Sequence, residues 1–440
     1  MITLSRAVAR RWVSLLGKTF GLSRELLKRQ AVRFQVDSQG LAIESATATH
    51  ALRYRDLKYH GLPQVWDAPL EAMQHLARSA ASSGEFFLRG EAQVLLRMVE
   101  KGIPREEGFS MQEVVLEAPA SPDSGYLLPL AGRHALIADF ETAEQEHPGR
   151  YALNQVQLQG SKATLAATDG RQLLLQGGLH WPFTEDLLLG NYRKLFRCGD
   201  FPEGPLEMSK TEQQLLFRVG NWEFFLPLGQ SQRYPSIADV LPSPSEAVAT
   251  MEISKGDAQY LRGMLSELPF EELDDEKPVT LELQNQIGVR SRSRKVPAGI
   301  EVVLRNSAWR GDAVSCAMKR EYLQRALDLG LREFQFFSSG CAPVVVRGGD
   351  KTYCWATYHP DSIVRGTPET ERRESPLEAK PCRSPSASPQ EGVSHAPVTT
   401  SRVSAVRKTS RRRNPCELRG TSRASRQTAL WRWSDAAKAG

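Results

Sequence analysis

Two stretches, RYALNQVQLQGSKATLAATDGRQL at residues 150–173 and RYPSIADVLP at residues 233–242, contain the pattern that decides the fold. In the first, apolar residues predict a strand that ends in a turn, followed by a second strand, KATLAATDG. Asp169 and Gly170 then supply the tight reversal into a third strand, which begins QLLLQGG. Taken alone, this stretch predicts antiparallel strands joined by an Asp-Gly turn.

The length and composition describe several globular domains. At 440 residues the chain is too long for one ordinary core and long enough for three domains of about 120 residues and a tail. Hydrophobic residues make up 40% and charged residues 25% of the sequence, as in soluble globular proteins. No apolar run approaches the roughly 20 residues of a membrane-spanning helix, so we expect no membrane partner.

The N-terminal sequence MITLSRAVARRWVSLLGKTF is basic and has no acidic residue before Glu25. Such a segment is compatible with a transit peptide and also with a first helix of the fold. Val8, Trp12 and Leu15 fall at helical spacing, so we favour an amphipathic helix over residues 6–18.

The six cysteines are scattered, with no CxxC pair and no clustering with the eight histidines. This distribution is typical of free thiols in a reducing cytoplasm and argues against a zinc site. We therefore expect a cytoplasmic protein without a bound metal.

Enzyme signatures are absent from the sequence, which contains no GxxxxGK[ST], GxGxxG, GxSxG or HExxH motif. Thr168 and Asp169 could be imagined as a nucleophile and a base, but neighbouring residues on a strand point to opposite faces. We interpret the acidic run EELDDE at residues 271–276 as a surface loop rather than a cation site. No catalytic residue and no cofactor is predicted.

Internal similarity divides the chain into three repeats. Segments that begin at residues 67, 187 and 315 share one plan: a strand or turn, a short amphipathic helix with basic residues, and two strands. Equivalent positions in these helices are near Ala72, Tyr192 and Tyr322. Each repeat also has an earlier helix candidate, at residues 6–18, 133–144 and 255–266.

Two helices and several antiparallel strands, repeated three times, predict an α+β architecture with the helices gathered on one face of the sheets. The expected domains span residues 1–124, 125–244 and 245–360. A tail over residues 361–440 follows them.

This tail is rich in Ser, Pro, Thr and Arg and lacks apolar periodicity, so we expect it to be disordered. It holds 16 basic and 8 acidic residues, which leaves 41 basic and 43 acidic residues for the body. Residues 393–440 hold 11 basic and 2 acidic residues and include RKTSRRR. Three interpretations stay open: a segment that binds phosphate backbones or a partner, a solvated linker, and an out-of-frame extension.

The two stretches quoted first resemble the central domain of the bacterial DNA polymerase III β sliding clamp. That family has a strand of the type RYxLNG, a TDGxRL turn and an FPDYxxVLP linker in the same order and at similar spacing. The resemblance covers residues 1–360 and is strongest in the central domain. It implies a homodimer whose two chains close head to tail into a ring around double-stranded DNA. It also implies two partners, the DNA polymerase III catalytic subunit and the clamp loader, and a cytoplasmic, nucleoid-associated location.

In such a ring the helices face inward, where Lys and Arg neutralise phosphates without reading bases. The helix at residues 133–144 is an exception because it carries Asp139, Glu141 and Glu144. By resemblance, Arg24 in the loop after the first helix and the pair Arg150 and Tyr151 contact DNA. The helices offer as further candidates Arg6, Arg10, Arg11, Lys18, Arg78, Arg193, Lys194, Arg197, Lys255, Arg262, Lys319, Arg320 and Arg325.

The same resemblance implies that the turn, the linker and the C-terminal strand form an apolar groove for short partner peptides. At the C-terminal edge the family has an MPMR-like sequence, whereas this chain has YCWATYHP at residues 353–360. The loss of flexible methionines implies altered peptide specificity or a groove partly blocked by the tail. The groove residues so assigned are Leu153, Thr168, Gly170, Arg171, Leu173, Pro242, Ala356 and Tyr358.

The first hypothesis is therefore a processivity clamp for a replicative polymerase. A second is a clamp-derived paralogue with a regulatory or DNA-binding role, which acts through its basic tail and has lost ring closure or peptide binding. A third is a nucleotide-handling enzyme on an unrelated α+β fold, for which Asp169 is the residue to test.

Overall fold

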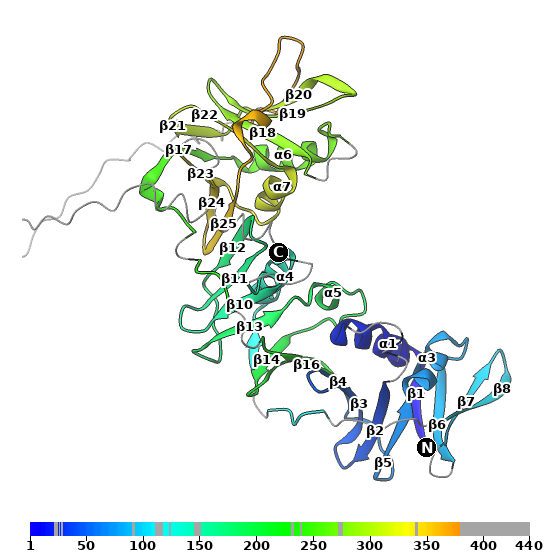
Figure 1. Cartoon of the computed structure of the whole chain (residues 1–440). Helices are drawn as coiled ribbons and strands as arrows, with labels where there is room; N and C mark the ends of the chain where they lie inside the picture. The colour runs from blue at the N-terminus through cyan, green and yellow to red at the C-terminus, as the bar shows by residue number, and fades with distance from the viewer. Residues whose placement is uncertain are drawn as a thin grey trace, which may run out of the picture.

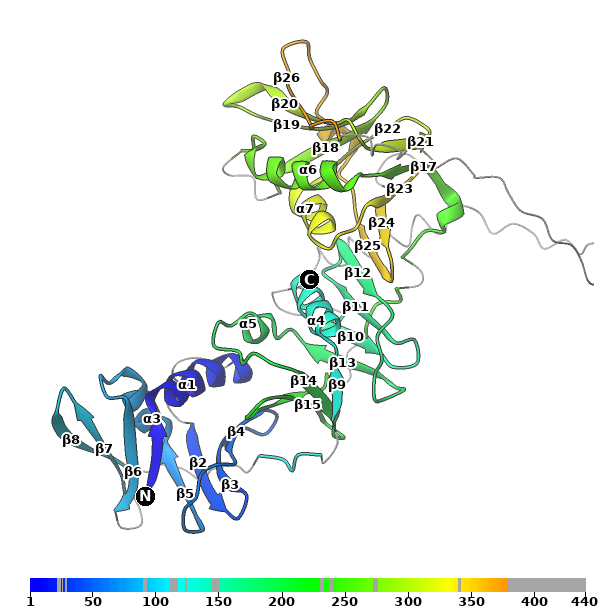
Figure 2. The same cartoon turned by 180° about the vertical axis from the view of Figure 1, so that it is seen from behind.

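A computed structural model of the chain describes residues 1–21, 25, 27, 30–89, 93–110, 118–122, 125–144, 151–229, 233–237, 240–271, 276–338 and 342–378. Three α+β units follow one another along a crescent, from the N-terminal unit in blue to the C-terminal unit, which runs from green through yellow to orange (Figure 1). The helices face the concave side of this crescent, with the sheets behind them, in both the front and the reverse view (Figure 2). The expected α+β class with helices on one face is confirmed.

Each unit repeats one order of elements: a strand, a helix, a run of strands, a second helix and three strands. The first unit consists of β1 (Ile2–Ser5), α1 (Arg6–Phe20), β2 (Ala31–Asp37), β3 (Gly40–Ala46), β4 (Ala51–Asp56), β5 (Gln64–Pro69), α3 (Leu70–Arg78), β6 (Ser83–Arg89), β7 (Gln93–Glu100) and β8 (Ile103–Ser110). The second consists of β9 (Tyr126–Leu128), α4 (Leu130–Thr142), β10 (Gln155–Gln159), β11 (Thr164–Thr168), β12 (Gln172–Gln176), β13 (Asp186–Gly190), α5 (Arg193–Phe196), β14 (Leu206–Lys210), β15 (Gln214–Val219) and β16 (Trp222–Pro227). The third consists of β17 (Ala247–Glu252), α6 (Lys255–Glu267), β18 (Pro278–Leu283), β19 (Ile287–Ser293), β20 (Val296–Leu304), β21 (Ala308–Gly311), β22 (Val314–Lys319), α7 (Arg320–Asp328), β23 (Glu333–Phe337), β24 (Val344–Gly348) and β25 (Lys351–Trp355), and β26 (Glu371–Glu374) follows it.

The first helix of each unit lies where the sequence predicts it. The Ser5 side chain caps the N-terminus of α1 by accepting a hydrogen bond from Val8 N at 3.3 Å, and Gly21 ends the helix with φ +62°. Trp12 and Leu15 are fully buried beneath α1, which confirms that this segment is an amphipathic helix of the fold. No helix within the described residues is long and apolar enough to cross a membrane.

The second helices are shorter, and α5 is a single turn. Asn191 Oδ1 accepts a hydrogen bond from Arg193 N at 3.0 Å at its start. The chain leaves the helix again after Phe196, whose ring is buried against Phe140 of α4. The helix expected near Tyr192 is therefore confirmed, although it carries only one turn of basic residues.

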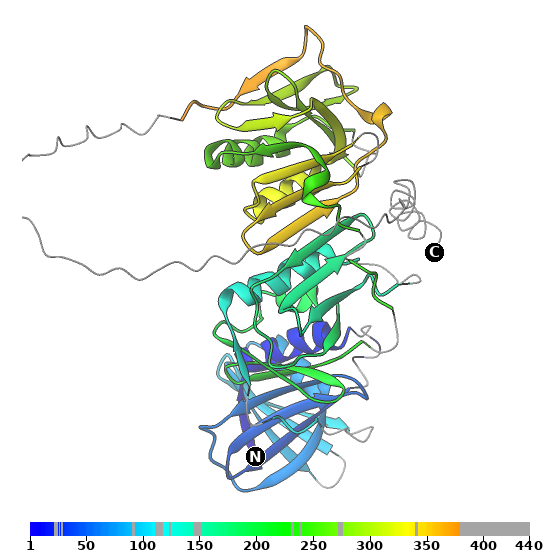
Figure 3. The same cartoon turned by 90° about the vertical axis from the view of Figure 1, so that its left-hand side faces the viewer.

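Neighbouring units are joined by continuous sheets. An eight-stranded sheet in the order β5-β2-β3-β4-β16-β15-β14-β9 spans the first and second units, and a nine-stranded sheet in the order β13-β10-β11-β12-β25-β24-β23-β17-β21 spans the second and third. The two junctions are the antiparallel pairs β4–β16 and β12–β25. Figure 3, turned by a quarter, shows the units stacked end to end along these sheets. Backbone hydrogen bonds thus fix each unit against the next.

Aliphatic and aromatic side chains together fill the core. One buried cluster runs through the first and second units and includes Trp12, Phe34 and Phe217, while a second cluster fills the third unit around Phe334 and Trp355. The burial of these side chains removes apolar area from water and stabilises the fold.

The third unit does not end near residue 360. Val364 N donates a hydrogen bond to Thr280 Oγ1 at 2.8 Å, and β26 then pairs with β20 in parallel. Ser375 is only 1% exposed. The expectation of disorder from residue 361 is therefore wrong for residues 361–378, because this stretch is held by hydrogen bonds and ion pairs that apolar periodicity does not reveal. Residues 379–440 lie outside the described residues.

Candidate nucleic-acid interface and partner groove

Basic side chains are exposed on the concave side of the first two units. Arg10 and Arg11 project from α1, Arg78 from α3, and three more from α5. The last three are Arg193, Lys194 and Arg197. We call the surface formed by α1, α3, α4, α5, α6 and α7 the helical face (Figures 1 and 2). Its exposed guanidinium and ammonium groups can neutralise phosphates without reading bases.

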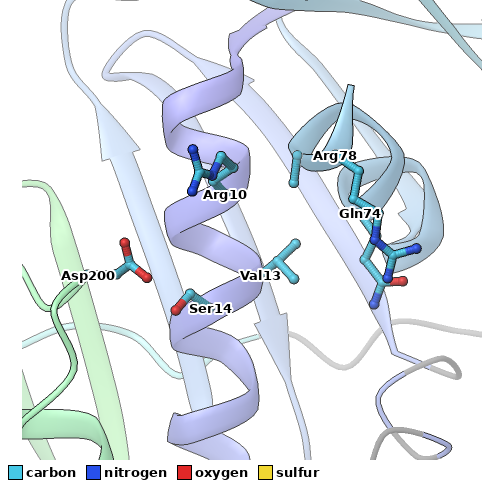
Figure 4. Close-up of a pocket in the computed structure, with 7 residues that line it drawn as sticks. Arg10, Val13, Ser14, Gln74, Arg78 and Asp200 are labelled. Carbon is cyan, nitrogen blue, oxygen red and sulfur yellow. The ribbon is translucent and has the colours of Figure 1, made fainter. Parts of the chain in front are cut away.

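A small hollow of about 260 Å³ opens between α1 and α3 on this face. Figure 4 shows Arg10, Val13 and Ser14 on α1 beside Gln74 and Arg78 on α3, with Asp200 on the other side of α1. Two arginines and one aspartate leave this hollow with a net positive charge.

A larger hollow of about 900 Å³ lies between the second and third units, where α4, α5, α6 and α7 meet. Its charge is mixed, because Arg262 pairs with Asp328 at 2.6 Å and Arg197 pairs with Glu141. Lys351 at the start of β25 is a basic residue here that sequence reasoning missed, since nothing in the local pattern distinguishes it from any other strand residue. Besides His134, the charged lining residues are Glu141, Arg193, Arg197, Arg262, Glu321, Arg325, Asp328 and Lys351.

Arg325 joins the second and third units. Its guanidinium donates hydrogen bonds to the carbonyl oxygens of Ala138 at 2.6 Å and Glu141 at 3.1 Å, both on α4. Its side chain is only 19% exposed. This arginine therefore fixes α7 against α4 rather than offering a charge to a ligand.

Arg320 does not face the solvent, which contradicts its expected role as a DNA contact. It is 6% exposed, and its guanidinium donates to the carbonyl oxygens of Leu268 and Pro269, each at 2.8 Å. Burial lowers the pKa of this guanidinium. The role of Arg320 is to hold the loop after α6 against α7.

Lys319 is also poorly placed for DNA. Its ammonium group lies 3.3 Å from a carboxylate oxygen of Glu321 and 5.8 Å from the ring centroid of Tyr322, and its side chain is 21% exposed. These neighbours engage much of its charge locally.

The chain segments at residues 151–153 and at residue 233 meet in space. Ala152 N donates a hydrogen bond to Arg233 O at 3.3 Å, and Tyr151, which is half-buried, accepts a backbone hydrogen bond from Leu153 N at 2.9 Å. Arg24 and Arg150, which the resemblance assigns to DNA, lie outside the described residues.

The turn between β11 and β12 is built by its own side chains. Asp169 Oδ1 accepts hydrogen bonds from Arg171 N and Gln172 N, both at 2.8 Å, while Thr168 Oγ1 donates to Gln172 O at 2.7 Å. Gly170 adopts φ +88°, which favours glycine. The hydroxyl and the carboxylate are thus committed to the turn. No group of three or more His, Cys, Asp or Glu side chains within the described residues is placed to hold a metal ion.

An apolar cluster lies behind this turn, on the sheet that joins the second and third units. Its buried members are Leu173 of β12, Val345 of β24 and Cys354 of β25. Leu153 is buried and is not a member of this cluster, whose half-buried neighbours supply the apolar surface near the turn. These neighbours include the linker residues, and they are Leu175, Ile237, Val240, Leu241 and Phe337, with half-buried Pro242 beside them in the chain.

The C-terminal edge meets the turn. Ala356 N donates to Arg171 O at 2.9 Å, so Ala356 lies beside the turn as expected. Arg171 and Tyr358 both bind the carboxylate of Glu276, and the Arg171 contact measures 2.7 Å. Tyr358 N donates a hydrogen bond to Ala317 O of β22 at 2.8 Å. We call Arg171, Glu276 and Tyr358 the polar rim.

Glu276 is the residue of this rim that sequence reasoning missed, because it ends the acidic run interpreted as a surface loop. Burial opposes its ionisation, but hydrogen bonds from Tyr358 and Arg171 hold the pKa of its carboxyl below the usual value. The rim is therefore a charged pair with a tyrosine cap at neutral pH.

Three copies of one α+β domain, joined by continuous sheets and lined by helices on one concave face, define the sliding-clamp fold. The chain has this fold over most of its length. It is similar to the Bacillus subtilis DNA polymerase sliding clamp, with 12% identity and a TM-score of 0.67 over 81% of this chain and 98% of that one. It is also similar to the DNA polymerase III subunit beta of Pseudomonas aeruginosa, with 18% identity and a TM-score of 0.62, and to the beta subunit of Thermotoga maritima, with 13% and 0.63. Each covers 81% of this chain and 99% of the solved one. No family model matches the sequence, and no curated protein matches it either.

Proposed function

We propose that this protein is a DNA sliding clamp that encircles duplex DNA as a homodimer and tethers a replicative polymerase. One observation carries the proposal: three repeated units present their helices to a single concave face, and the helices of the first two units carry exposed basic side chains. A near-neutral body has no net charge with which to hold nucleic acid, so local basic groups and ring closure must do so together. The protein would act without covalent chemistry.

The way the units are joined supports the ring. Both junctions within the chain continue a sheet from one unit into the next, through β4–β16 and β12–β25. At the N-terminal end of the crescent β8 is an open sheet edge, and at the other end β20 is the last strand of the third unit's sheet before the added β26. Two chains placed head to tail bring these ends together and give a ring of six units.

The groove residues support a second part of the proposal, in which short apolar peptides of the polymerase and of the clamp loader bind beside the polar rim. Half-buried Leu175, Phe337 and Pro242 offer apolar area, and Arg171 offers a charge at the edge. Because Ala356 is small and Tyr358 is engaged by Glu276, we expect a peptide preference different from that of a methionine-lined groove.

Retention on circular DNA tests the clamp function. The full-length protein, assembled with its cognate loader on a nicked circular plasmid, should co-elute with the DNA through a sizing column at moderate salt. Linearising the plasmid should release it, because a ring slides off a free end. Equal retention on the circular and linear forms would contradict a topological attachment, and so would the absence of retention on either.

A second candidate function is a clamp-derived protein that binds DNA through its basic tail and does not form a ring. The cis pairing of β26 with β20 favours it, because an outer sheet edge is already occupied. Such a protein would have the mass of one chain at every concentration, and removal of residues 379–440 would abolish its DNA binding.

A further inference from the structure

The internal repeat identifies the strand edges that must pair to close a ring. Each unit contains two antiparallel meanders of three strands, and each junction pairs the last strand of one unit's first meander with the last strand of the next unit's second meander. At the first junction, β4 of the meander β2-β3-β4 pairs with β16 of β14-β15-β16. At the second, β12 of β10-β11-β12 pairs with β25 of β23-β24-β25. The equivalent strands left over are β20 and β8. A third junction of the same kind would pair β20 of one chain with β8 of another.

The β8 edge is open. Within the described residues β8 pairs with β7 alone, and it forms the outer edge of a four-stranded sheet. Its residues IPREEGFS are mostly exposed, and Ile103 at its start is 60% exposed. An uncovered edge of this length presents unpaired backbone donors and acceptors to another strand.

The β20 edge, in contrast, is occupied by the chain's own β26. The parallel register runs from Ile300 opposite Glu371 to Val303 opposite Glu374, on the side of β20 away from β19. Ser375 extends the pairing, since its N–H donates to Val303 O at 2.9 Å and its hydroxyl accepts from Arg305 N at 2.9 Å. The two chain junctions are antiparallel, so β26 covers the edge without reproducing a junction.

Polar contacts hold this strand in place. Arg372 lies 3.3 Å from Glu301, whose side chain is 6% exposed, and Arg373 lies 3.0 Å from Glu267. Beyond the strand, Glu378 accepts hydrogen bonds from Gly256 N at 3.0 Å and from the hydroxyl of Ser254 at 2.8 Å, at the start of α6. The strand itself buries no apolar side chain, so its pairing depends on these contacts and on the short tether to β25.

We propose that residues 370–378 are a cis strand that blocks ring closure, and that a second copy of this chain pairs its β8 with β20 only after the strand is displaced. The inference rests on the clamp function proposed above. A tethered strand acts at an effective concentration on the order of millimolar, so at micromolar protein it outcompetes a second copy. The chain would therefore be an open monomer in solution. It would form a ring only where the cis strand is displaced and a second chain is present.

The test uses the full-length chain with Arg372→Glu and Ser375→Pro combined. A glutamate at position 372 meets buried Glu301, and a proline at position 375 removes the N–H that donates to Val303. Arg365→Glu is the matched control, because it makes the same charge change at an exposed position before the strand. Sedimentation velocity at about 10 µM reports the mass, and amide hydrogen exchange reports which edge is covered.

We expect the parent chain and the control to sediment as one chain, with slow exchange at residues 372–375. The double variant should exchange rapidly at residues 372–374, since the substituted position 375 has no amide hydrogen. It should also sediment as two chains and gain protection in β8, with a dimer dissociation constant at least about tenfold lower than that of the parent. Three results would overturn the inference: a parent dimer whose residues 372–375 stay protected, a released variant that remains a monomer, or slow exchange at these residues in the double variant.

A different result would contradict the clamp function on which this inference rests. A double variant that dimerises through β8 but is not retained on nicked circular DNA would disprove the clamp and leave the cis strand supported. Retention of the parent chain on circular DNA with residues 372–375 still protected would support the clamp function and disprove the blocking role of the cis strand.

Discussion

Asp139 of α4 is fully buried near the junction of the second and third units, and burial raises the pKa of its carboxyl to about 8. Gln176 Nε2 donates to Asp139 Oδ2 at 2.5 Å. Within the described residues, neither Asp139 Oδ1 nor Gln176 Oε1 has a hydrogen-bond partner. A neutral carboxyl suits this environment better than a carboxylate, because burying a charge without a compensating partner is costly.

This pKa predicts a pH-dependent stability. The folded state keeps a proton that the unfolded chain releases at the ordinary aspartate pKa near 3.9, so the free energy of unfolding falls as pH rises from about 4 to 8. We expect Asp139→Asn to remove this dependence and to raise the free energy of unfolding at pH 8 by about 1–2 kcal/mol. Urea unfolding at pH 5 and pH 8 measures both effects. Asp312→Asn, at an exposed position, should keep the parent's pH dependence, and an unchanged slope for Asp139→Asn would contradict the assignment.

Arg193 and Arg320 show what a sequence can and cannot reveal about a site residue. Each is the first residue of a short helix, and helical spacing predicts equally for both that the side chain is exposed on the surface. The difference arises from a distant segment, since the carbonyls of Leu268 and Pro269 capture the Arg320 guanidinium. Such a contact depends on tertiary structure and leaves no trace in the local pattern.

At the scale of elements, segments that bury an apolar face were predictable and exposed edges were not. The spacing of Trp12 and Leu15 predicts α1, and the Asp169-Gly170 pair predicts the turn between β11 and β12. By contrast β8, IPREEGFS, and β26, ERRE, contain few apolar residues and were not predicted as strands. Their pairing depends on backbone hydrogen bonds and ion pairs, which a hydrophobic pattern does not encode.

The β4–β16 junction contains a buried ion network centred on Arg53. Its guanidinium lies 3.0 Å from Glu44 and 3.1 Å from Glu223, and it also donates to the carbonyl oxygens of Ala118 and Pro119. All three charged side chains are 6% exposed or less. Backbone hydrogen bonds and a buried ion network thus both hold the first unit against the second.

Breaking this network from one side should cost more than replacing it. We expect Arg53→Met to lower the free energy of unfolding of the joined units by about 3–5 kcal/mol, because Glu44 is left as a buried, unpaired carboxylate. Adding Glu44→Gln should restore at least about 1 kcal/mol, since the stranded charge is removed. Urea unfolding followed by the fluorescence of Trp12 and Trp222, which lie 6.0 Å apart across these units, measures the change. A double variant no more stable than the single one would show that the loss lies in hydrogen bonds rather than in charge.

At the scale of the whole molecule, the body has little net charge, so the proposed DNA binding depends on where its basic groups lie. The helices α1, α3 and α5, which carry exposed arginines and a lysine, line one concave face (Figure 2), whereas the sequence alone could only assign these residues to helices. The relative placement of the units, set by the β4–β16 and β12–β25 pairs, turns separate basic helices into one surface.

The salt dependence of binding to linear duplex DNA tests this surface. Replacing four basic residues of the helical face with alanine should lower the slope of log Kobs against log salt by about 3–4, since each lost phosphate contact removes roughly 0.9. Retention on nicked circular DNA at moderate salt should survive, because the ring and not the charge then holds the DNA. A control variant loses the same number of positive charges at exposed positions in strands and turns, and it should keep the parent's slope. An equal decrease of the slope in both variants would show that the DNA does not pass along the helical face. The helical-face variant changes Arg10, Arg78, Arg193 and Lys194, and the control changes Lys58, Lys101, Lys162 and Arg292.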